Sequence, residues 1–211
     1  MSLAETSPFA DAHRHLARRE PKLKPVIRRV GPCTLQIRPD PFGVLASSII
    51  SQQISGKAAE SIGNRVRKLC GRGGIRPKRI AELPDADLRG CGLSQGKLLS
   101  MRSLSQFFLD RPKIGSDLRS MTDEDVIETL LPIRGVGVWT AQMFLIFCLG
   151  RPDVLPTADL GLRAGIRDLW GLPELPKAEE IEKVSFSWRP FRTVATWYLW
   201  RSRGPVPQSD D

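Results

Sequence analysis

Apolar residues recur at intervals of three and four along most of this chain, and that spacing predicts helices. From Phe42 onward it predicts two helices joined near residues 52–56, the second of which carries Ala58, Ala59, Ile62, Val66 and Leu69. Residues 72–83 then predict a loop that leads into a short helix.

Start and stop signals divide the middle of the chain into further helices. Residues 84–110 predict two helices that are separated at Gly90–Gly92, with Ser94 as the N-cap of the second. Thr122 is followed by three acidic residues, which is typical of a helix start because the helix dipole favours negative charge there. Pro132 should stop that helix, since its ring and missing N–H group cannot continue it.

The last third of the chain continues the helical pattern. A helix should run from Val138 to Gly150, and residues 151–159 should form a constrained connector before another helix begins at Asp159. Two more helices are predicted over residues 178–186 and 192–201. Strictly alternating polar and apolar runs are missing from this part of the sequence, so the predicted fold class is all-α.

Residues 1–41 are rich in proline and charge, and they predict an N-terminal arm with short strands, a pair of them around residues 26–37. Residues 42–211 form the main helical unit of this prediction. His13 and His15 are a weak metal signal, because two histidines without further ligands are more often found in a solvated segment.

Composition narrows the range of functions. The 211 residues carry a formal charge of +9, which favours a polyanionic partner, although a merely soluble basic protein is about equally compatible. The four cysteines are scattered, which argues against a zinc or iron–sulfur site and for a reducing compartment. No apolar stretch is long enough for a membrane span, and the first twenty residues lack the apolar core of a secretory signal, so we expect a soluble intracellular, cytoplasmic protein.

The segment LPIRGVGV, residues 131–138, places a tight turn between two apolar helices. Its glycines belong where the backbone needs a positive φ or where another molecule approaches closely. The free N–H groups at the start of the second helix, together with the positive end of its dipole, could hold a phosphate without reading sequence. An ordinary corner between two helices, with glycines that serve only the turn, is the alternative.

LPIRGVGVWTAQM, with RPDVLPTAD after it, resembles the helix-hairpin-helix motif and catalytic aspartate of a DNA glycosylase superfamily. The resemblance extends to DPFGVLASSIISQQISGKAAESIGNRV, GLSQGKLLSMRSL and WRPFRTVATWYLW, and therefore covers residues 41–201. Within the superfamily, the AlkA-type 3-methyladenine DNA glycosylases II are most similar. The resemblance implies two helical lobes with a cleft between them for DNA and the damaged base.

The resemblance also assigns residues that hold DNA. The hairpin backbone of the family binds a phosphate, which implies DNA contacts at Arg134, Gly135, Val136, Gly137 and Thr140. Hairpin carbonyls in the family hold a monovalent cation that bridges to DNA, and here these belong to Leu131, Ile133 and Val136. A structural Na⁺ or K⁺ is therefore implied with DNA, while no cofactor is required for the reaction.

Asp159 aligns with the catalytic carboxylate of the family. Cleavage of an N-glycosidic bond builds positive charge on the deoxyribose, so a fixed carboxylate near C1′ stabilises the transition state and can orient the attacking water. The alternative is that Asp159 is only a helix N-cap, which is a common role for aspartate.

Bifunctional relatives carry a Schiff-base lysine two residues after the second hairpin glycine, where this chain has Trp139. An indole has no amine to attack C1′, so we expect a monofunctional enzyme without lyase activity. The resemblance places Trp139, Met143 and Trp200 in the base pocket, where electron-rich rings would favour a positively charged alkylated purine. The two tryptophans could equally be core residues on helix faces.

A damaged base must leave the helical stack before its glycosidic bond can be reached. SQQIS, residues 51–55, matches the family's wedge turn, with Gln53 in the wedge position and Gln52 as a supporting residue. Both glutamines could instead decorate an exposed turn. Lys57 and Arg163, like Arg134, could add phosphate contacts, but any single one is more often a solvated surface charge.

These observations predict a monomeric, monofunctional glycosylase of base excision repair that acts on damaged double-stranded DNA and hydrolyses alkylated purines of the 3-methyladenine type. A glycosylase for oxidised, deaminated or mismatched bases is the first alternative. A helix-hairpin-helix protein that binds DNA without catalysis is the second, although the presence of Asp159 argues against it.

Overall fold

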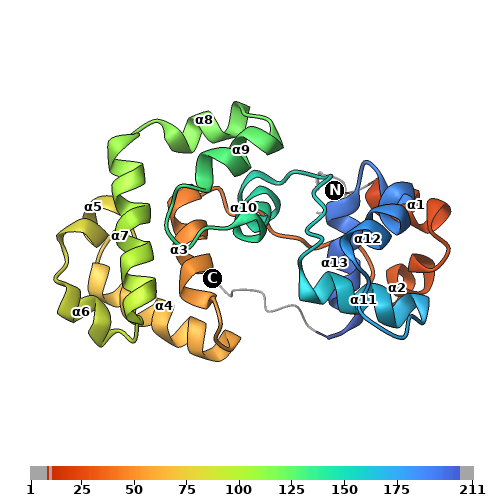
Figure 1. The fold of residues 1–211 in the computed structure, drawn as a ribbon, viewed down its shortest axis with the longest axis horizontal. Helices are drawn as coiled ribbons and strands as arrows, with labels where there is room; N and C mark the ends of the chain where they lie inside the picture. Colours follow the sequence, from red (N-terminus) through yellow and green to blue (C-terminus); the bar gives the residue numbers. More distant parts are fainter. Residues whose placement is uncertain (1–8, 10, 205–211) are drawn as a thin grey trace, which may run out of the picture. The chain divides into compact units, whose positions relative to one another are not determined.

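A computed structural model of the chain describes residues 9 and 11–204, and none of these residues lies in a β-strand. They form two compact units, both helical (Figure 1). Unit 1 contains the described residues up to Ile37 and those from Gly150 onward, and unit 2 contains residues 38–149. The all-α prediction is therefore confirmed. No helix within the described part is long and apolar enough to cross a membrane.

Unit 2 is built from eight α-helices and a π-helical turn. The helices are α3 (Pro41–Ser51), α4 (Gly56–Cys70), α5 (Pro77–Glu82), α6 (Asp85–Gly90), α7 (Gln95–Asp110), α8 (Ile114–Ser120), α9 (Asp123–Leu130) and α10 (Val138–Phe144). The π-helical turn Leu145–Leu149 continues α10. The long helix α7 packs against α3 and α5, and α10 packs against α3 and α9.

Side-chain caps set several of these boundaries, as the sequence predicted. The Ser94 hydroxyl accepts the Lys97 N–H at the start of α7, and the Thr122 hydroxyl accepts the Asp125 N–H at the start of α9. Each bond satisfies one of the N–H groups that a helix start leaves unpaired. Helix α8 was not predicted, because a seven-residue helix has too few turns to show a clear period.

The described residues of unit 1 form α1 (Ala12–Arg19), α2 (Leu23–Val30), α11 (Leu160–Trp170), α12 (Ala178–Ser185) and α13 (Arg192–Ser202). A 3-10 turn, Phe186–Trp188, follows α12. Helix α13 packs against α2 and α11, and α1 packs against α2. The core of the unit includes Leu16, Leu23, Trp188, Tyr198 and Leu199, all of which are buried.

The predicted strand pair around residues 26–37 is wrong. Residues 23–30 form α2, and residues 32–39 have no regular secondary structure. Leu23, Val26 and Ile27 are buried at helical spacing, so the period of three and four decides the element. Pro25 is compatible with this helix because it lies in the first turn, where no backbone N–H donor is needed.

The N-terminal segment also differs from a separate arm, since its described residues share the core of unit 1 with α11 and α13. His13 and His15 both lie in α1, two positions apart and so on different faces of the helix. The His15 ring packs edge-on against Phe191, with 5.3 Å between the ring centroids. Residues 1–8 and 10 of the predicted arm, and 205–211 of the predicted main unit, lie outside the described residues.

Candidate functional site

The hairpin of unit 2 joins α9 to α10 through a tight turn. The Val136 N–H donates to the Ile133 carbonyl at 3.0 Å, which closes a four-residue turn over residues 133–136. Gly135, the third residue of that turn, has a φ of 79°, the left-handed conformation that a type II turn needs at this position. Gly137 then becomes the N-cap of α10, and its carbonyl accepts the Ala141 N–H at 3.0 Å.

The two hairpin glycines have different reasons to be glycine. A Cβ on Gly135 would lie 2.5 Å from the Ser100 hydroxyl oxygen of α7, so both its φ and its neighbour exclude a side chain. Gly137 has an extended backbone, with a φ of −104°, and a Cβ there would meet no described atom within 4 Å. Glycine is among the residues preferred at a helix N-cap, and the space beside Gly137 is open.

Several predicted site residues of the hairpin region are exposed, and others are not. Trp139 is 39% exposed, and Leu131 and Val138 beside it are more exposed still. Thr140 and Met143 are buried at 3% and 6% exposure because these positions of α10 face the core of unit 2. Both residues therefore present little surface to another molecule. Ile133 and Val136 are also buried, while Arg134 is exposed.

The glutamine turn lies against the hairpin. The Gln52 side-chain amide donates to the Gly135 carbonyl at 2.9 Å, across 83 residues of sequence. Gln53 has a φ of 58°, the only positive value among the described residues that are not glycine, and its side chain is exposed. A left-handed glutamine is an uncommon conformation that points to a constrained turn. The structure therefore brings the predicted wedge turn and the predicted phosphate site together within unit 2.

Helix α7 supports both loops with one row of side chains. The Lys97 ammonium donates to the Ile50 carbonyl at 2.6 Å near the end of α3, and burial lowers its pKa. Ser100 packs against Gly135, and the Ser103 hydroxyl accepts the Arg134 N–H at 3.0 Å. None of these three residues was predicted from the sequence to have a role. Their spacing of three along GLSQGKLLSMRSL was the available signal, because such residues share one helix face.

Asp159 of unit 1 ends the 151–159 loop and caps α11. Its Oδ1 accepts the Leu162 N–H at 2.7 Å, and its own N–H donates to the Pro156 carbonyl at 2.8 Å. The residue is only 9% exposed. The N-cap role that was the alternative for Asp159 is thus present, and it places the carboxylate at the positive end of the α11 dipole.

Trp200 on α13 makes a second bond to the same carboxylate oxygen. Its indole N–H donates to Asp159 Oδ1 at 2.7 Å, across 41 residues of sequence. A Cβ on Gly161 would lie 2.8 Å from the Trp200 ring and 3.1 Å from Asp159 Oδ1, so glycine is required for this approach. A cap alone needs no such partner. The carboxylate is therefore held from two directions, and Trp200 has a contact that the sequence did not predict.

Residues 46–190 match the family model of the HhH-GPD superfamily of base excision DNA repair proteins, and this range contains the glutamine turn, the hairpin and Asp159. The chain belongs to the HhH-GPD superfamily.

Individual HhH-GPD proteins are similar over nearly the whole chain. The alkylbase DNA glycosidase-like protein mag2 of Schizosaccharomyces pombe is 33% identical over 204 residues, which is 94% of this chain and 96% of that protein. A solved structure of the 3-methyladenine DNA glycosylase of the same organism in complex with abasic DNA has a TM-score of 0.83 at 33% identity, covering 92% and 97% of the two chains. DNA-3-methyladenine glycosidase from Bacillus halodurans gives 0.79 at 34% identity, covering 94% and 90%.

The remaining charged candidates are arranged differently from one another. Arg163 donates to the Pro176 carbonyl at 3.1 Å and so has a structural partner within unit 1, whereas Lys57 at the start of α4 is exposed.

The cysteines are poor candidates for chemistry, because burial raises the pKa of Cys33 and that of Cys148 to about 11 and keeps both thiols protonated near neutral pH. Among the described residues, no three His, Cys, Asp or Glu side chains gather as a metal site.

Proposed function

We propose that this HhH-GPD protein is a monofunctional DNA glycosylase that hydrolyses the N-glycosidic bond of alkylated purines in double-stranded DNA and leaves an abasic site. The observation that carries the proposal is the carboxylate of Asp159, which is nearly buried and accepts two hydrogen bonds of 2.7 Å at one oxygen. Family membership supports base excision repair as the process. The names of similar proteins, alkylbase and 3-methyladenine glycosylases, support alkylated purines as the substrate class.

In the proposed reaction, Asp159 acts on the sugar. The bond between C1′ and the base nitrogen breaks, and its electron pair leaves with the base, so that positive charge develops on C1′ and the ring oxygen. An ionised Asp159 stabilises that charge, and a water molecule adds its oxygen to C1′ while its proton passes to the carboxylate or to solvent. An alkylated purine that is already cationic takes the electron pair and leaves as a neutral base, which makes modest catalytic assistance sufficient.

Trp139 supports the absence of lyase chemistry. A lyase needs an amine to form a Schiff base at C1′, and the indole at this position offers none. Its ring is 39% exposed and would stack on a flipped base, where the ring face would favour a cationic purine. Trp200 would act mainly by fixing Asp159, since its N–H group already bonds that carboxylate. Met143 is buried, so its side chain would contribute through the packing of α10.

The hairpin and the glutamine turn are proposed to hold the DNA. Backbone N–H groups around Gly135 and Gly137 would contact a phosphate, and the open space at Gly137 would admit it closely. Gln53 would fill the gap left by the flipped nucleotide, and Gln52 would keep that turn registered on the hairpin through its bond to Gly135. The exposed Arg134 and Lys57 would add phosphate contacts.

The hairpin carbonyls of Leu131, Ile133 and Val136 are proposed to bind Na⁺ or K⁺ when DNA is present. The Ile133 carbonyl already accepts the Val136 N–H, but a carbonyl oxygen has two lone pairs and can accept a second partner. Such neutral oxygen donors suit a hard monovalent cation. The reaction itself would require no cofactor, and the protein would act as an intracellular monomer.

Release of free base tests the proposal. Duplexes carrying 3-methyladenine, hypoxanthine or 8-oxoguanine are incubated with the protein, and the released bases are identified by mass spectrometry. We expect 3-methyladenine release and a strand that breaks only after alkali treatment. Preferred release of hypoxanthine or 8-oxoguanine would assign another lesion class, and release of no base despite DNA binding would favour a silent binding protein. Borohydride trapping of the protein on DNA would contradict the monofunctional assignment.

A further inference from the structure

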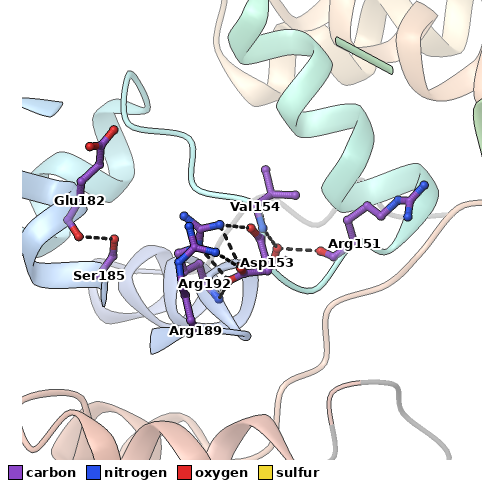
Figure 2. Close-up of polar contacts among 8 residues, drawn as sticks. Arg151, Asp153, Val154, Glu182, Ser185, Arg189 and Arg192 are labelled. Atoms are coloured by element: carbon purple, nitrogen blue, oxygen red, sulfur yellow. Dashed lines mark hydrogen bonds and ion pairs between the residues drawn. The ribbon is translucent and has the colours of Figure 1, made fainter. Parts of the chain in front are cut away.

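The 151–159 loop that carries Asp159 is tied to the start of α13 by an ion-pair cluster (Figure 2). The Arg192 guanidinium donates to both carboxylate oxygens of Asp153, with Nε–Oδ1 and Nη2–Oδ2 distances of 2.8 and 2.9 Å. Arg189 donates to Oδ2 from a second side, at 2.9 Å. The Asp153 and Arg192 side chains are 24% and 17% exposed. A bidentate pair with this little exposure fixes geometry better than a single bond between solvated side chains.

Main-chain bonds reinforce the same junction. The Thr193 hydroxyl donates to the Arg151 carbonyl at 2.7 Å and accepts the Val154 N–H at 3.0 Å. The Thr193 N–H donates to the Pro152 carbonyl at 3.0 Å, and the Arg192 N–H donates to Asp153 at 3.3 Å. The first turn of α13 thus directs its unpaired N–H groups to the loop. We name residues 151–154 together with Arg189, Arg192 and Thr193 the loop clamp.

The segment between the loop clamp and Asp159 is short and conformationally restricted. Only residues 155–158 lie between them, and Pro156 restricts one of these four. Two short-range bonds tighten the segment further: the Thr157 N–H donates to the Leu155 carbonyl at 3.0 Å, and the Asp159 N–H donates to the Pro156 carbonyl at 2.8 Å. A displacement at Asp153 would therefore be passed to Asp159 instead of being absorbed by the chain.

Helix α13 contacts the same loop a second time, near the C-terminal end of the helix. Trp200, which bonds Asp159, follows Arg192 by eight residues, or about 12 Å along a rigid helix. Two glycines of α11 allow the close packing that this requires, because a Cβ on Gly161 would strike Trp200 and a Cβ on Gly165 would lie 2.9 Å from Leu199 Cβ. One helix thus holds the start and the end of the loop at a fixed separation.

We propose that Asp153 and Arg192 are positioning residues for the glycosylase reaction, acting through α13 to hold the Asp159 carboxylate against Trp200. The inference rests on the proposed catalytic role of Asp159. Neither residue touches the reacting atoms. Loss of the clamp should leave DNA binding intact, because the hairpin and the glutamine turn belong to unit 2, and should lower the rate of the chemical step, because small misplacements of a catalytic group are costly.

The test compares Asp153→Asn and Arg192→Lys with a matched control, Asp168→Asn. Asp168 also pairs with two arginines of unit 1, Arg167 and Arg203, but it has no bond to the loop. For each variant, the single-turnover rate of 3-methyladenine release is measured at saturating protein, together with the Kd for a duplex containing an abasic-site analogue. Arg192→Lys retains the positive charge and one bond to Asp153, so it provides a folded variant even if Asp153→Asn is unstable.

A spectroscopic readout separates positioning from general stability. The indole N–H resonance of Trp200, assigned with Trp200→Phe, reports its bond to Asp159 in ¹H–¹⁵N spectra at a temperature where every variant is folded. We expect Asp153→Asn to move this resonance towards its position in Asp159→Asn and to speed its exchange with solvent. The control Asp168→Asn should leave it in place.

We expect Asp153→Asn to lower the release rate at least about tenfold with the Kd changed less than twofold, and Arg192→Lys to fall between it and the wild type. An unchanged rate and resonance in both clamp variants would overturn the positioning role while leaving the proposed function intact. A rate loss with the Trp200 resonance unmoved would also overturn it. Wild-type protein that releases no base would instead refute the proposed function.

Discussion

The hairpin of unit 2 and the carboxylate of unit 1 are constructed in opposite ways. The hairpin presents mainly backbone groups. Gly135 has a left-handed conformation, the space beside Gly137 is open, and neighbouring side chains are exposed. Asp159 offers a side chain that is 9% exposed and held by bonds from its own helix and from α13. Backbone groups can bind a DNA phosphate whatever the DNA sequence, whereas a reaction at one carbon atom needs a charged group at one defined position.

The supports of the two regions differ in the same sense. Helix α7 steadies the hairpin and the glutamine turn with single bonds to backbone atoms, from Lys97 and to Ser103. The Asp159 loop is fastened by a bidentate ion pair, a buried threonine and an indole. The difference predicts that changes at the hairpin alter DNA affinity and that changes around Asp159 alter the rate at saturating DNA.

Asp159→Asn should have the largest effect. The asparagine keeps the size and a capping oxygen but removes the negative charge that we propose stabilises the developing cation, so the rate at saturating DNA should fall by about 100-fold or more. Single-turnover release of 3-methyladenine measures it. Binding to an abasic-site duplex should be retained. Loss of binding would show that the carboxylate also contributes to DNA affinity.

Gly135→Val should have the second-largest effect, and it should change the Kd for DNA instead of the rate. A β-branched residue is strained at a φ of 79° and would meet the Ser100 hydroxyl, so the turn should open and DNA affinity should fall about tenfold. Fluorescence anisotropy with an abasic-site duplex measures the Kd. Gly96→Ala on α7 is a suitable control, because its Cβ would meet no described atom within 4 Å. Equal losses for both variants would remove the special role of the turn.

Trp200→Phe should lower the rate by about tenfold, because it removes one charge-assisted hydrogen bond of roughly 1.5–3 kcal/mol but keeps most of the ring packing. The Kd for abasic DNA should stay within twofold. Trp170→Phe, at the end of α11, makes the same change away from the carboxylate and controls for the loss of an indole. A rate loss of the same size in both variants would indicate a general packing defect.

The glutamine turn should give the smallest effects. Gln52→Leu removes its bond to the Gly135 carbonyl, and a net contribution of about 1 kcal/mol corresponds to roughly a fivefold weaker Kd. Gln53→Gly keeps the left-handed turn and removes only the wedge side chain, so it should slow release from a well-stacked duplex a few-fold without lowering the Tm. Fluorescence of 2-aminopurine beside the lesion reports the flipping step. Unchanged flipping with Gln53→Gly would assign the wedge to another residue.

Much of the fold was predictable because its boundaries are marked by local signals. Ser94, Thr122 and Asp159 cap the helices that the sequence predicted, and each does so through a side-chain bond three residues along the chain. The strand prediction at residues 26–37 failed because prolines and charged residues interrupt the local pattern, whereas Leu23, Val26 and Ile27 are buried at helical spacing.

The supporting contacts were not predictable for a different reason. The Trp200–Asp159 bond spans 41 residues, and the Gln52–Gly135 bond spans 83. Neither partner shows in its own sequence neighbourhood which group it will meet. Gly161 is informative only once the packing of α11 against α13 is known, because it then explains how the indole reaches the carboxylate. The sequence thus indicates candidate groups such as Asp159, while tertiary packing decides how firmly they are held.

The most direct test of this division of roles is the rate of 3-methyladenine release from a methylated duplex as a function of protein concentration, for Gly135→Val and Asp159→Asn in parallel. We predict that the Gly135→Val rate rises to the wild-type plateau once the protein concentration exceeds its weakened Kd. The Asp159→Asn rate should stay about 100-fold below that plateau at every concentration. A wild-type plateau for Asp159→Asn, or a permanently lowered plateau for Gly135→Val, would contradict the account.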